Sequence, residues 1–164
     1  MLVEFKVQNF LSFKELQTLT MVTSALKELR ETNTFNASDN MTLLRSAVMY
    51  GANASGKSNF VEAISFMKKF IINSSKESQT LENIPVMRFQ LSSDTEDKPS
   101  LFEITFIHNE IKYRYGFEAD QSKIHNEWLF YAPKRKEAKL FTRENDKIEL
   151  GSYFKEGKGL ESKT

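Results

Sequence analysis

Cysteine is absent from the 164 residues of this chain, and glycine and proline are scarce, with 6 and 3 copies. Without cysteine, disulfides and thiolate metal sites are excluded, which fits a reducing compartment. The formal net charge is only +1, so any binding of nucleic acid would need a local basic patch. No stretch approaches the roughly 20 apolar residues of a membrane span, and the N-terminal MLVEFKVQNF does not have the pattern of a signal peptide. We therefore expect a soluble cytoplasmic protein with no membrane partner.

Apolar residues nevertheless make up 40% of the chain and include 14 phenylalanines, enough for a substantial core. The length suits one domain, which we expect to span residues 1–150. Residues 151–164 are polar and carry three glycines, so we expect a flexible, poorly packed tail there.

Hydrophobic periodicity predicts the main elements. Alternation predicts strands over Leu2–Phe10 and Glu15–Val22, and a meander of antiparallel hairpins over about 100–150. A continuous apolar run ends the segment Leu43–Tyr50, which predicts a strand buried on both faces. A short helix near Leu26–Arg30 and then a polar loop are expected before it. Helical spacing predicts a helix over about 58–73, with an apolar face made of Phe60, Ala63, Ile64, Met67, Phe70 and Ile71.

The segment from Gly51 to Ser58 matches the phosphate-loop pattern G-x-x-x-x-G-K-[ST]. Such a loop wraps a phosphate with backbone N–H groups, so its residues must be small, as Ala52, Ala54 and Ser55 are. Lys57 supplies positive charge to the β- and γ-phosphates, Ser58 offers a hydroxyl to Mg²⁺, and the following helix presents its N-terminal dipole to the anion. By chance the pattern would arise in roughly one chain in 200 of this length. The pattern therefore predicts binding of ATP and Mg²⁺ at residues Gly51, Ala52, Asn53, Ala54, Ser55, Gly56, Lys57, Ser58 and Asn59.

The stretch YGANASGKSNFVEAI resembles the Walker A region of ABC-type ATPases of the SMC, RecF and OLD-nuclease group. The phrase VQNFLSF at residues 7–13, near the start of the chain, also resembles the opening phrase of these ATPases. The resemblance extends from Met1 to about Arg143 and is nearest to the bacterial stand-alone AAA-family ATPases often found in anti-phage defence systems. It implies an α/β fold of the P-loop NTPase class: the N-terminal lobe of an ABC-type ATPase, with an antiparallel β-hairpin subdomain.

The resemblance also implies roles for single residues. Asn53 would contact the bridging-oxygen region of the triphosphate, and Ser12 and Phe13 of the opening turn would line the site. Two positions depart from the family pattern: Ala54 stands where glycine is usual, and Leu11 stands where arginine is frequent.

Two parts of a complete ATPase site do not stand out in the sequence. One is an apolar strand ending in an acidic pair, which positions Mg²⁺ and the attacking water; the other is an LSGG-like signature. Gln90 is a candidate for the Q-loop glutamine by position alone. We therefore expect the N-terminal part of a longer ATPase, which binds ATP but hydrolyses it slowly. The resemblance further implies a homodimer closed by ATP that gates a nuclease or another effector.

Several features have simpler interpretations. The basic cluster Lys134-Arg135-Lys136 with Lys139 fits a nucleic-acid backbone but also a solvated turn. The aromatic residues Tyr113, Tyr115, Trp128 and Phe130 fit base stacking but also one face of a sheet. His108 and His125 have no metal-ligand spacing around them. A GTPase or a small-molecule kinase would need further motifs that the sequence does not show. A non-catalytic interaction module with a relic phosphate loop remains the alternative.

Overall fold

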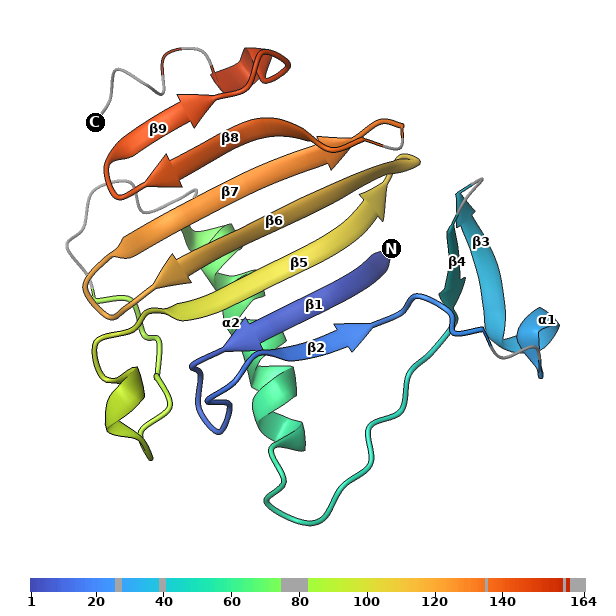
Figure 1. Ribbon diagram of the computed structural model, residues 1–164, viewed down its shortest axis with the longest axis horizontal. Helices are drawn as coiled ribbons and strands as arrows, with labels where there is room; N and C mark the ends of the chain where they lie inside the picture. The colour runs from blue at the N-terminus through green and yellow to red at the C-terminus, as the bar shows by residue number, and fades with distance from the viewer. Residues whose placement is uncertain (26–27, 39–40, 75–82, 135, 158, 160–164) are drawn as a thin grey trace.

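The computed structural model describes residues 1–25, 28–38, 41–74, 83–134, 136–157 and 159. An antiparallel seven-stranded sheet dominates it, with the strand order β2-β1-β5-β6-β7-β8-β9 (Figure 1). Its strands are β1 (Leu2–Gln8), β2 (Gln17–Thr20), β5 (Ser100–His108), β6 (Ile111–Ala119), β7 (Ile124–Ala132), β8 (Ala138–Glu144) and β9 (Lys147–Leu150). The meander predicted over about 100–150 is confirmed, because β5 to β9 pair consecutively and antiparallel.

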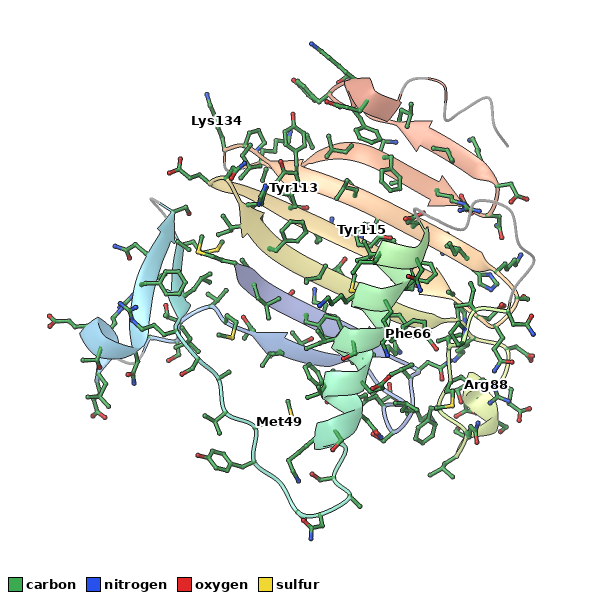
Figure 2. The ribbon with its side chains drawn as sticks, turned by 180° about the vertical axis from the view of Figure 1, so that it is seen from behind. Met49, Phe66, Arg88, Tyr113, Tyr115 and Lys134 are labelled. Carbon is green, nitrogen blue, oxygen red and sulfur yellow. The ribbon has the colours of Figure 1, made fainter. Side chains whose placement is uncertain are left out.

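The helix α2 (Lys57–Ser74) crosses one face of this sheet, behind it in Figure 1 and in front of it in Figure 2. Phe60, Ala63, Phe66 and Met67 are buried against the sheet. Their partners in the main core are Phe5, Val7, Phe10, Val86, Phe102, Phe117 and Ala119. Ile71, which the helical spacing places on the apolar face, is instead 41% exposed.

A second, smaller unit is the hairpin of β3 (Thr34–Ser38) and β4 (Met41–Leu44), preceded by α1 (Arg30–Asn33). Its residues Ala37 and Leu43 pack with Val3 and Ile107 at the end of the sheet. The polar loop expected up to Asn40 is therefore wrong for the described residues 34–38. The short helix begins at Arg30, later than predicted, and residues 26 and 27 of that prediction lie outside the described part of the chain.

The strand predicted over Leu43–Tyr50 is also wrong beyond Leu44, where β4 ends. Val48 is 70% exposed and Tyr50 is 88% exposed. A strand buried on both faces needs neighbouring strands for its N–H and C=O groups, and no described strand pairs with residues 46–50. Met49 lies in this segment, to the left of the N-terminal end of α2 in Figure 2.

The described part of the C-terminal tail contacts the sheet. The Phe154 ring stacks on Phe141 at 5.9 Å between centroids, and the Tyr153 ring meets Tyr131 at 5.9 Å. A short 3₁₀ helix follows over Lys155–Gly157, where Gly157 is buried. Aromatic contacts thus hold residues 151–157 to β7 and β8. The polar composition of the tail, which predicted poor packing, does not reveal these contacts.

Candidate nucleotide-binding site

The predicted phosphate loop forms an exposed turn directly before α2. Ser55 N donates to Ala52 O at 3.2 Å, and Gly56 has a φ of 93°, in a region that L residues rarely adopt. Phe60 N donates to Gly56 O at 3.0 Å, so the first helical hydrogen bond begins at Gly56. The N–H groups of the residues that follow are left without helical acceptors, as at any helix N-terminus. The chain therefore presents donors to an anion where the motif predicts them.

Ala54 occupies the left-handed region, with a φ of 62°. This conformation costs an L residue roughly 1–2 kcal/mol relative to its usual region, and glycine adopts it freely. The departure from glycine noted in the sequence thus carries a strain, and the small Ala54 side chain is exposed.

The Lys57 side chain folds back over the loop. Its Nζ donates to Gly51 O at 2.7 Å, to Ala52 O at 2.6 Å and to Ser55 Oγ at 3.3 Å. Among the ion pairs of the described residues, none includes Lys57. Neutral oxygens orient this ammonium group, and no carboxylate among the described residues forms an ion pair with it. Its charge remains available to a phosphate.

A side chain at Gly51 would disturb this arrangement. A Cβ built on Gly51 would lie 2.5 Å from Ser55 Oγ and 3.8 Å from Lys57 Nζ. Glycine at this position therefore leaves room for the serine and lysine side chains that curl over the loop.

The opening turn between β1 and β2 lies against the phosphate loop. A Cβ on Gly56 would come within 2.9 Å of Ser12 Oγ and 3.3 Å of Phe13 Cε1. Asn59 Nδ2 donates to Ser12 Oγ at 2.9 Å, and the rings of Phe13 and Phe60 meet edge to face at 6.0 Å. The fold therefore brings Ser12 and Phe13 beside residues 56–60, and the contact between Ser12 and Asn59 spans 47 residues of sequence. That the two residues line a nucleotide site stays a prediction.

Ser58 and Asn53, the residues assigned to Mg²⁺ and to the triphosphate, are both exposed at the loop. The described residues contain no cluster of three or more His, Asp or Glu side chains that could hold a metal by itself. Mg²⁺ in nucleotide sites keeps several waters and takes its other ligands from phosphates. The single hydroxyl of Ser58 fits that pattern of partial protein coordination.

A family model described as "AAA domain, putative AbiEii toxin, Type IV TA system" matches residues 46–164. The chain belongs to this AAA family. No curated protein matches the chain. The family supports nucleotide binding, and its match includes the whole phosphate loop of the AAA domain together with α2 and β5 to β9. The opening strand and its turn lie before the matched residues, yet the contacts with Gly56 and Asn59 join them to the same site.

Gln90 of the AAA domain lies in an irregular segment before β5 and is exposed. The neighbouring backbone is tied to the opening turn: Leu11 N donates to Met87 O at 2.8 Å, and Phe89 N donates to Asn9 Oδ1 at 3.1 Å. The structure thus connects the segment that carries Gln90 to the turn that carries Ser12 and Phe13. Sequence reasoning missed Asn9, although it lies inside the opening phrase that carried the resemblance.

The remaining candidates in the AAA domain have structural partners. Tyr115 donates its hydroxyl to Glu127 Oε1 at 2.8 Å, and burial together with this carboxylate raises its pKa. Trp128 Nε1 donates to Glu103 Oε2 at 2.9 Å, and the guanidinium of Arg114 lies 4.5 Å from the ring centroid of Phe130. These contacts support the interpretation of the aromatic residues as parts of the sheet.

The two histidines and the basic cluster lie apart from the phosphate loop. His125 Nε2 lies 2.6 Å from Asp120 Oδ2 in the turn before β7, and His108 ends β5. Lys134 and Lys136 are exposed between β7 and β8, and Arg135 lies outside the described residues (Figure 2). Among the described helices, none is long and apolar enough to cross a bilayer.

Proposed function

We propose that the chain binds ATP with Mg²⁺ through residues 51–59, as the N-terminal lobe of an ABC-type ATPase of the SMC, RecF and OLD-like kind. The observation that carries the proposal is the position of Lys57, whose ammonium is held over the loop by Gly51 O and Ala52 O. A cation positioned at a helix N-terminus without a carboxylate partner is suited to a phosphate group.

The contact of the opening turn with the loop supports the ABC-type assignment. Ser12 and Phe13 meet Gly56, and Asn59 holds the Ser12 hydroxyl. In this arrangement residues 51–59 together with Ser12 and Phe13 would hold the triphosphate, Asn53 would contact its bridging-oxygen region and Ser58 would offer its hydroxyl to Mg²⁺. The magnesium ion supplies neutralisation of charge on the phosphates.

Isothermal titration with ATP and Mg²⁺ tests the proposal. Lys57→Ala removes a charged donor worth about 3 kcal/mol, so we expect Kd to rise roughly a hundredfold. Lys68→Ala is the matched control, because it removes the same charge from an exposed position further along α2. Equal affinity of the native chain and Lys57→Ala, or no binding by the native chain, would refute the proposal and favour an interaction module with a relic loop.

Catalysis and assembly are further parts of the proposal. In the part of the chain that the structure describes, no carboxylate forms a hydrogen bond or an ion pair with residues 51–59, so we expect turnover below about 1 per second. We further propose that ATP closes a homodimer that gates a nuclease or another effector in a defence or DNA-maintenance system. Light scattering of the ATP-saturated chain tests dimerisation, and a monomer at saturation would refute that part for this chain.

A further inference from the structure

Asn9 is a buried polar residue at the end of β1 that the proposed chemistry does not use directly. It is 3% exposed and has a φ of 51°, in the left-handed region that asparagine tolerates better than most residues. Burying an amide is costly unless its hydrogen bonds are satisfied. The contacts that satisfy it therefore indicate what the residue holds in place.

The Asn9 side chain joins two parts of the segment before β5. Its Oδ1 accepts from Phe89 N at 3.1 Å, while its Nδ2 donates to Lys98 O at 2.7 Å. The same Nδ2 lies 3.3 Å from Thr95 O and 3.4 Å from Pro99 O. One amide group thus binds both arms of the loop that runs from Phe89 to Pro99.

The Asn9 backbone fixes the opening turn at the same point. Its carbonyl accepts from Ser100 Oγ at the start of β5. The next residue closes the turn, since Phe10 N donates to Phe13 O at 3.0 Å and Phe13 N donates to Phe10 O at 2.8 Å. The turn closed in this way presents Ser12 and Phe13 to Gly56.

We propose that Asn9 is a positioning residue for the nucleotide site, which sets the opening turn against the phosphate loop and holds the Gln90 segment beside that turn. This inference rests on the proposed ATP binding. Asn9 acts through Ser12 on one side and through the Phe89 backbone on the other. Loss of its donors lets the turn move away from Gly56, so the two sides of the phosphate site are no longer held together.

The test compares two variants of the same network in ATP titrations. Asn9→Asp keeps the acceptor for Phe89 N but removes the amide donor. Thr95→Val is the matched control: Thr95 is also buried, and its Oγ1 lies within hydrogen-bonding distance of Phe89 O (2.9 Å) and Ser92 O (2.8 Å). Thr95 meets Asn9 only through its backbone carbonyl, which valine keeps. Asn9→Gly, which keeps the left-handed backbone, replaces Asn9→Asp if the buried carboxylate prevents folding.

We expect Asn9→Asp to weaken ATP binding by about tenfold and Thr95→Val to weaken it by less than about twofold. The fall in Tm should be similar in the two variants. In the Ser12→Ala background the effect of Asn9→Asp on Kd should shrink, because both act through the same turn. Native affinity in Asn9→Asp and Asn9→Gly, equal loss in Thr95→Val, or full additivity with Ser12→Ala would overturn the inference while leaving ATP binding intact. Failure of the native chain to bind ATP would overturn both the inference and the proposed function.

Discussion

Gly56 offers a direct test of the contact between the phosphate loop and the opening turn. In Gly56→Ala the new Cβ would lie 2.9 Å from Ser12 Oγ and 3.3 Å from Phe13 Cε1. Ser12 can rotate away only by giving up its 2.9 Å hydrogen bond with Asn59. The φ of 93° adds a backbone cost of about 1–3 kcal/mol for an L residue. We therefore expect a loss of about 2 kcal/mol in the free energy of unfolding, which lowers Tm by about 4–8 °C in a domain of this size.

Circular dichroism melts and ATP titrations of the same samples measure both consequences. ATP affinity should fall together with Tm, because the strained residue lies between the loop and the turn. In the Ser12→Gly background the close contact with Oγ is removed, so Gly56→Ala should cost less there. An unchanged Tm in Gly56→Ala, or an equal cost in both backgrounds, would refute the reasoning that this glycine is required by the turn.

Three further predictions concern other sites. Ala54→Gly should stabilise the loop by up to about 1 kcal/mol, seen as a higher Tm, because the residue has a φ of 62°; a lower Tm would contradict this. Burial opposes ionisation of Glu103, but hydrogen bonds from Arg114, Lys6 and Trp128 outweigh it and lower the Glu103 pKa. Its stabilising contribution is therefore present above the ordinary glutamate pKa of 4.5 and is lost as pH falls through the lower folded pKa, so acid unfolding followed by Trp128 fluorescence should depend less on pH in Glu103→Gln. Tyr50→Ser should change the free energy of unfolding by less than about 0.5 kcal/mol, because Tyr50 is 88% exposed, and a loss above about 2 kcal/mol in urea titrations would show that the residue is packed.

The meander of β5 to β9 and the helix α2 could be predicted because their periodicities are local. Each strand of the meander alternates, and each turn is short, so neighbouring strands in sequence are neighbours in space. The hairpin of β3 and β4 was missed because its strands are short and rich in polar residues, with Asn36 and Thr42 facing each other in the register. Its formation depends on Ala37 and Leu43 reaching a core that is made elsewhere.

The residues of the candidate site also differ in whether the sequence could predict them. The loop and Lys57 follow from a contiguous motif, and the opening turn from a resemblance. The part played by Asn9 could not be predicted, because its partners are 80 to 90 residues away in an irregular segment. No periodicity marks that segment, and only the folded chain shows that one amide connects it to the turn.

The segment before the phosphate loop shows where sequence and surroundings disagree. Val48, Met49 and Tyr50 have the apolar pattern of a buried strand, yet each is exposed and none lies in a strand of the described chain. Natural sequences usually agree with their surroundings at every level, and exceptions concentrate at functional sites. This exception lies directly before Gly51. At its other end the phosphate loop continues into α2, which is packed on the sheet. A nucleotide would contact a loop that is anchored by the helix and the opening turn but not by the strand-like segment, so the helix side should dominate its affinity.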